Sequence, residues 1–127
     1  MKKETKIVKE IKSHKDLEVY KESMNLVEDI YRLTKELPSE EKFGLISQMR
    51  RAAVSIVSNI SEGAARKNTR EYIQFLYISQ GSLSELETQL DICLRLGYVE
   101  QNDSRAKNFN HINSMLSGLI ASLKRKL

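Results

Sequence analysis

A chain of 127 residues, with 40% hydrophobic and 30% charged side chains, has the composition of one ordinary folded domain. Five glycines and one proline are too few for an all-β chain with many tight turns, and no apolar run approaches the ~20 residues of a membrane span. The formal net charge of +4 lies entirely in the first 15 residues, which weakens it as a sign of a nucleic-acid-binding domain.

The segment 1–15 carries six lysines against Glu4 and Glu10. Its basic start is not followed by an apolar stretch, so we do not interpret it as a signal peptide. We expect a basic N-terminal arm, disordered or loosely packed, ahead of one domain over residues 16–127. The single Cys93 cannot form an internal disulfide, which agrees with a cytoplasmic, reducing compartment.

The first predicted helix covers residues 16–36, with Asp16 as its N-cap. Apolar side chains recur at steps of three and four residues and predict one buried face. That face consists of Leu17, Tyr20, Met24, Val27, Ile30 and Tyr31. Pro38 ends the helix because it lacks a backbone donor and disfavours helical geometry at Leu37.

The second predicted helix covers residues 39–66. Its apolar stripe consists of Phe43, Ile46, Met49, Ala53, Ile56 and Ile60. Small side chains beside the stripe, at Ala52, Ser55 and Ser58, allow a neighbouring helix to approach closely.

The third predicted helix covers residues 69–96, after Asn68 as N-cap and with Glu71 at capping-box spacing. Its heptad pattern is the strongest periodic signal in the chain. The pattern consists of Tyr72, Leu76, Ser79, Leu83, Leu86, Leu90 and Cys93. Gly97 is suited to the left-handed C-cap.

The fourth predicted helix covers residues 102–124. Its face consists of Phe109, Ile112, Leu116, Leu119 and Leu123, widened by Met115 and Ile120. Short connections force neighbouring helices to be antiparallel. The sequence therefore predicts an all-α, antiparallel up-down-up-down four-helix bundle.

Charge alternates along the predicted bundle. Residues 16–49 and 71–100 each sum to −4, whereas residues 50–70 and 101–127 each sum to +4. Complementary packing between oppositely charged helices is one explanation of the basic blocks, and a nucleic-acid-binding face is the other.

No residue pattern predicts catalysis. The glycines are scattered and form no phosphate loop, and His14 and His111 lack partners at metal-ligand spacing. Cys93 lies in the predicted core, and the acidic side chains near Glu87 fit a solvated helix face better than acid–base chemistry. We therefore expect no enzyme activity, no metal, no cofactor and no small-molecule substrate.

The second helix carries a polar row that its apolar packing does not require. Arg51, Ser55, Asn59 and Glu62 follow one another at steps of four and three residues. One interpretation is a hydrogen-bond network that fixes helix register or a subunit interface. The other is a polar site for a partner chain or a phosphate.

This helix also carries a family resemblance. Arg50-Arg51-Ala52-Ala53, followed by Ser55-Ile56-Val57-Ser58-Asn59-Ile60-Ser61-Glu62-Gly63, resembles the signature of the four-helix-bundle proteins encoded in intervening sequences of bacterial 23S rRNA genes. Further matches lie at residues 17–20, 43–45, 75–76, 81–82, 85–87 and 96–98. Two positions depart from the pattern, because the family often has Pro at Val57 and Ala at Ser61.

The resemblance implies a homopentamer with a central opening. A group similar in fold, the accessory proteins of diversity-generating retroelements, binds nucleic acid and a reverse transcriptase. Our leading hypothesis is a non-enzymatic oligomer that binds RNA or DNA by phosphate contacts. The candidate contacts are Arg50, Arg51, Arg66, Lys67 and Arg70. The alternative is a structural or protein-interaction module without a nucleic-acid role.

Overall fold

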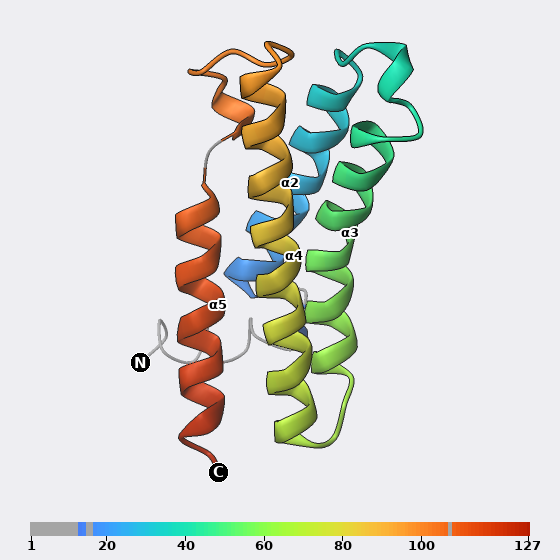
Figure 1. Ribbon diagram of the computed structural model, residues 1–127. Helices are drawn as coiled ribbons and strands as arrows, with labels where there is room; N and C mark the ends of the chain where they lie inside the picture. The colour runs from blue at the N-terminus through green and yellow to red at the C-terminus, as the bar shows by residue number, and fades with distance from the viewer. Residues whose placement is uncertain (1–12, 15–16, 107) are drawn as a thin grey trace.

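The computed structural model describes residues 13–14, 17–106 and 108–127, so the predicted N-cap Asp16 and most of the basic arm lie outside the described residues. Within these ranges the chain is all-α, with four long helices and no β-strand (Figure 1). The helices are α2 (Glu18–Thr34), α3 (Leu45–Ala64), α4 (Thr69–Arg95) and α5 (Phe109–Lys124). Two 3-10 turns, η2 (Ser39–Glu41) and η3 (Ser104–Ala106), lie in the connections. The predicted all-α class is confirmed.

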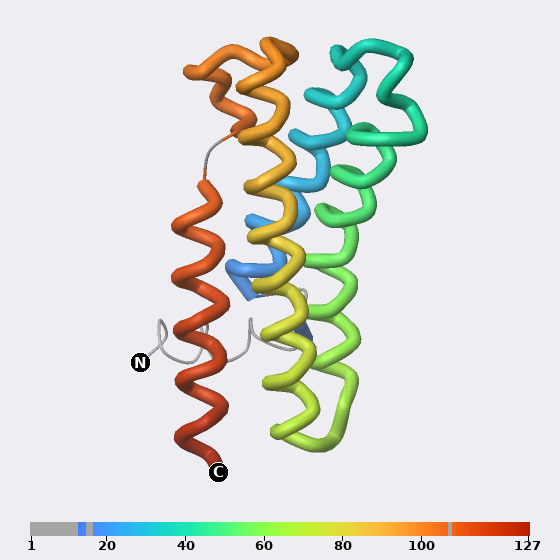
Figure 2. The backbone as a smooth tube through the Cα atoms, viewed as in Figure 1, coloured from blue at the N-terminus to red at the C-terminus, as the bar shows by residue number. Residues whose placement is uncertain are grey.

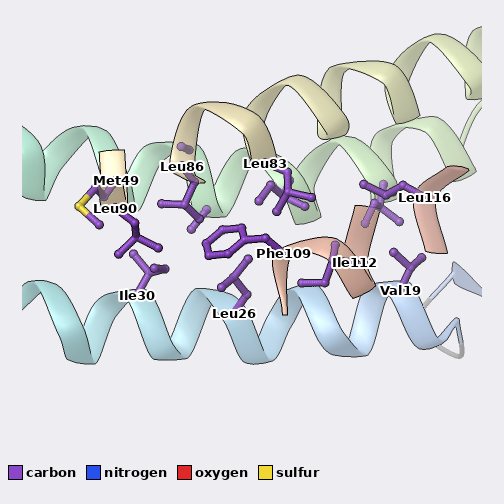
Figure 3. Close-up of a cluster of buried hydrophobic side chains, with 14 of the residues drawn as sticks. Val19, Leu26, Ile30, Met49, Leu83, Leu86, Leu90, Phe109, Ile112 and Leu116 are labelled. Carbon is purple, nitrogen blue, oxygen red and sulfur yellow. The ribbon is translucent and has the colours of Figure 1, made fainter. Parts of the chain in front are cut away.

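The four helices pack around one shared core. Helix α4 contacts both α3 and α5, and α2 contacts the same two helices. Figure 3 shows side chains from all four helices pointing toward one another, with Ile30 of α2 close to Leu90 of α4 and Phe109 of α5 between Leu26 and Leu86. No helix among the described residues is long and apolar enough to cross a membrane.

The third helix was predicted correctly from its pattern. All seven heptad residues are buried except Tyr72, which is half-buried. The Asn68 side chain accepts a hydrogen bond from the Glu71 N–H at 3.1 Å, as an N-cap should. At the other end Gly97 has φ 77°, and the N–H groups of Gly97 and Tyr98 bond the carbonyls of Leu94 and Cys93. These two bonds form a Schellman C-cap.

Two predicted helix starts were wrong. The second helix begins at Leu45 and not at Ser39, because the Gly44 backbone (φ −113°, ψ −111°) is not helical and η2 precedes it. The fourth begins at Phe109 and not at residue 102, because Asn108 adopts a left-handed conformation (φ 75°). Phe43, which was assigned to the stripe of the second helix, is therefore in the connection and 89% exposed.

The predicted face of the first helix was also displaced. The buried row of α2 is Val19, Ser23, Leu26, Ile30 and Leu33. Most of the predicted row lies beside it, and Met24 and Tyr31 are 39% and 38% exposed. Both rows have helical spacing. The row that forms the core includes the polar Ser23, which makes it look less apolar in the sequence.

Candidate nucleic-acid interface

The five predicted contact residues lie in two separate groups along the bundle. Arg50 and Arg51 belong to the first half of α3, whereas Arg66, Lys67 and Arg70 surround the connection between α3 and α4. At 1.5 Å per residue the two groups are about 20 Å apart. The structure therefore does not bring the predicted set together as one site.

Arg50 is held against the end of α2. Its Nε donates to Thr34 Oγ1 at 2.9 Å, and a terminal nitrogen donates to the Tyr31 carbonyl at 3.3 Å. The guanidinium lies 4.5 Å from the centroid of the Tyr31 ring. Arg50 thus joins α3 to the C-terminal end of α2, and two of its five N–H donors are used there.

Arg51 and the residues around the α3–α4 connection are more accessible. Arg51, Lys67 and Arg70 are exposed, and none of them forms an ion pair with another described residue. Arg66 is different, because it pairs with Glu62 at 3.1 Å and Glu71 at 3.9 Å. Its guanidinium also lies 4.9 Å from the centroid of the Phe75 ring.

The predicted polar row divides into two parts. Ser55 Oγ lies 2.8 Å from Ser82 Oγ of α4, and Asn59 Nδ2 donates to Ser55 Oγ at 3.0 Å and to the Ser55 carbonyl at 2.8 Å. Glu62 is instead paired with Arg66. The row therefore makes one interhelical bond, at Ser55, and Asn59 supports it from within α3.

Small residues bring α3 and α4 close together along this row. Ser79 of α4 is fully buried and donates to the Ile56 carbonyl at 2.8 Å. A Cβ placed on Gly63 would lie 2.8 Å from Tyr72 Cδ1 and 2.9 Å from Phe75 Cβ. Several polar and small residues of the α3 signature therefore pack against α4.

Basic residues from distant parts of the sequence meet at one end of the bundle. Figure 1 shows the α3–α4 connection and the chain's C-terminus at the same end. A hollow of about 300 Å³ is lined by both Arg70 and Lys124. We call this the basic end, and its residues are Arg66, Lys67, Arg70, Lys124, Arg125 and Lys126. Sequence reasoning missed the last three as contacts because only the packing of α5 on α4 brings the C-terminal end of α5 to the end of the bundle that carries Arg70.

Many carboxylates lie at the opposite end. Arg105 donates to both Glu36 oxygens and to Asp103 Oδ2 at 2.8 Å, which fastens the α4–α5 connection to the end of α2. The side-chain hydrogen bonds from Arg105 lower the pKa of both carboxyl groups. Tyr98 donates to Glu41 Oε2 at 3.0 Å, and this bond raises the pKa of the Tyr98 hydroxyl.

The residues with metal-binding or nucleophilic potential are dispersed. Among the described residues, no group of three His, Cys, Asp or Glu side chains is placed to hold a metal ion. Cys93 is fully buried, with its sulfur 3.6 Å from Met49 Sδ, and burial raises the pKa of the thiol.

The structure is that of an all-α, four-helix protein in which α3 and α4 contact each other through small and polar residues. Residues 15–118 match the family described as 23S rRNA-intervening sequence protein, and the chain belongs to that family. The resemblance noted in the sequence is thereby confirmed. No curated protein matches the chain.

Proposed function

We propose that this chain is a non-enzymatic, oligomeric protein that binds RNA through its basic end. The observation that carries the proposal is the meeting of Arg70 and Lys124 at one hollow, which joins the basic residues of two segments distant in sequence. Six cations gather there, and the carboxylates of Glu62 and Glu71 both pair with Arg66. Such a surface attracts phosphates without reading base sequence.

The structure changes which residues we expect to contact RNA. Arg50 is committed to α2, so we now assign it a structural role. Lys67 and Arg70 remain candidates, and Lys124, Arg125 and Lys126 join them. Arg51 is exposed but lies about 20 Å from this end, so we expect it to contribute little to the same site.

The proposal includes an antiparallel up-down-up-down arrangement and self-association. The short α3–α4 connection and the direction of the colour along successive helices in Figure 2 support the arrangement. The exposed apolar side chains of Met24, Tyr31 and Val54 support contact with further copies. A closed ring, as the resemblance implies, would repeat the basic end once per subunit. The buried, unpaired Cys93 thiol supports a cytoplasmic setting.

Charge reversal at the basic end tests the proposal. Lys67→Glu, Arg70→Glu and Lys124→Glu together should weaken binding to a structured RNA roughly tenfold or more in low salt. The slope of log affinity against log salt should decrease by about 2 to 3, because each lost phosphate contact removes roughly 0.7 to 0.9. Fluorescence anisotropy with labelled RNA measures both quantities.

The matched control reverses three exposed cations at the other end, Lys35, Lys42 and Arg95. An equal loss of affinity in this control would show that net charge, and not the basic end, drives binding. Binding of the unmodified protein that does not respond to salt would contradict the proposal directly.

The alternative is a structural or protein-interaction module with no nucleic-acid role. Its support is the Ser55–Ser82 bond and the close approach at Gly63, since both give the family signature a packing purpose. Under this alternative the basic-end variant should behave like the unmodified protein, and no RNA complex should form.

A further inference from the structure

The seam between α4 and α5 has two adjoining hollows at the basic end. One is about 300 Å³ and is lined by Arg70, Ile73, Gln74, Tyr77, Lys124 and Leu127. The other is about 240 Å³ and is lined by Tyr77, Gln80, Ser117, Ile120, Ala121 and Lys124. Tyr77 and Lys124 line both hollows, so an aromatic ring and a cation lie at their boundary.

The side chain of Tyr77 is accessible to solvent. Tyr77 is 41% exposed, whereas Ile73 and Ile120 beside it are 4% and 5% exposed and belong to the core. Lys124 Nζ lies over the Tyr77 ring, 5.5 Å from its centroid. Nucleic-acid bases stack on accessible aromatic rings, and nearby cations bind their phosphates.

The charge of this groove has one sign. Arg70 and Lys124 are the charged side chains that line the two hollows, and residues 104–127 contain no Asp or Glu. A separate hollow farther along α4 and α5 includes Glu87 instead. The cationic character is therefore confined to the end of the seam where Tyr77 lies.

Amide groups supply hydrogen-bonding capacity at the groove. Gln74 lines one hollow, and Gln80 of the other donates to Asn113 Oδ1 at 3.1 Å and Ser117 Oγ at 2.9 Å. These two bonds fix the Gln80 amide and use both hydrogens of its Nε2, so Gln74 is the amide whose N–H groups we expect to pair with the edge of an unstacked base.

We propose that this groove binds an unpaired nucleotide of single-stranded RNA. The base stacks on Tyr77, and the flanking phosphates bind Arg70 and Lys124. A hollow of about 300 Å³ is at the lower limit of small-ligand sites, which suits one nucleotide. A duplex is excluded from the stacking contact because its bases are already paired and stacked. This inference rests on the proposed function, since it assigns a strand preference to the basic end.

The test compares two RNA probes of the same sequence, one single-stranded with roughly ten nucleotides and one duplex. The single strand contains 2-aminopurine, whose fluorescence falls when it stacks on an aromatic ring. We expect quenching on binding, and we expect Tyr77→Leu to abolish it and to weaken single-strand binding roughly tenfold. Duplex binding should not change, and Tyr77→Phe should retain both the quenching and the affinity.

Phe43→Leu is the matched control. Phe43 is 89% exposed and also has a cation, Lys42, over its ring, but it lies in the connection between α2 and α3 at the other end of the bundle. Its substitution should change neither quenching nor affinity. Photocrosslinking of a 4-thiouridine single strand to the unmodified protein provides a readout that does not depend on a variant's stability, and the crosslinked peptide should contain Tyr77.

The outcomes separate this inference from the proposed function. If charge reversal at the basic end weakens binding but Tyr77→Leu does not, or weakens duplex binding equally, RNA still binds there and the stacking site is wrong. If neither change has an effect, both proposals are wrong. Free adenosine monophosphate that competes as well as the strand would also overturn the inference, because the site would then be one for free nucleotides.

Discussion

Gly63 lies at the tightest point between α3 and α4. It is buried within α3, and an added Cβ would come within 3.0 Å of two atoms of α4 residues. One of them is the Cβ of Phe75, which is attached directly to the backbone and cannot rotate away. The backbone of α4 must therefore move if this glycine gains a side chain.

Gly63→Ala should lower the free energy of unfolding by about 1–3 kcal/mol, the usual cost of overpacking. Its matched control is Gly81→Ala in α4, where nothing lies within 4 Å of the added Cβ. That control should raise stability by about 0.5–1 kcal/mol, because alanine is the better helix former. Urea denaturation measures both, and a stabilising Gly63→Ala would contradict the close approach.

Arg105 makes stability depend on pH at the other end of the molecule. Its hydrogen bonds lower the pKa of Glu36 and Asp103 in the folded state. A carboxyl group with a lowered folded pKa stabilises the fold above its unfolded pKa of about 4, and that contribution is lost as the pH falls through the folded value.

Arg105→Gln should therefore lower the Tm by a few degrees at neutral pH. The difference from the unmodified protein should shrink progressively below about pH 4, where both carboxyl groups become protonated. Thermal melts followed by circular dichroism over a pH series provide the check. Arg95→Gln is the control, since Arg95 is exposed and forms no ion pair with the described residues. If the Tm difference between Arg105→Gln and the unmodified protein stayed constant with pH, lost packing of the Arg105 side chain would explain it instead.

Helices α3 and α4 share the most extensive contact of any helix pair in the bundle. Their contact includes the Ser55–Ser82 bond at 2.8 Å and the buried Ser79, which bonds the Ile56 carbonyl. Asn59, another residue of the predicted polar row, bonds Ser55 of its own helix and no other described residue. The interhelical connection is therefore better tested at Ser55 than at Asn59.

A double-mutant cycle on Ser55→Ala and Ser82→Ala should give an interaction energy of about 1 kcal/mol. Each single change leaves one hydroxyl without this partner, so the double variant should be more stable than the sum of the two effects predicts. Thr88→Ala serves as the control, because Thr88 is exposed and its hydroxyl bonds the Ser84 carbonyl of its own helix and no other described residue. Additive effects at Ser55 and Ser82 would show that the bond contributes nothing.

Basic residues of separate segments gather at one end of the bundle, so charge differs between its ends as well as between its helices. The alternating segment charges suggested that each basic helix is neutralised by an acidic neighbour. The structure brings Arg70 of α4 and Lys124 of α5 to one hollow, at the end of the bundle where the α3–α4 connection carries Arg66 and Lys67. Complementary packing therefore does not account for the basic end.

We expect the protein to self-associate in solution. Multi-angle light scattering should give a mass that is a multiple of 14.6 kDa, and five copies are expected from the family resemblance. The exposed Met24, Tyr31 and Val54 provide the physical reason, because apolar surface is stabilised by contact with a second copy. A monomer at working concentration would remove the ring from the proposed function.

The all-α class and the third helix with both its caps were predictable from the sequence, because they depend on periodicity and on local hydrogen bonds, and the family was predictable from its signature residues. The sequence did not determine which of two rows of α2 is buried, since both have helical spacing and only the neighbouring helices choose between them. The basic end with Tyr77 between Arg70 and Lys124 was decided by tertiary structure alone. Residues some fifty positions apart become neighbours only when α5 packs on α4.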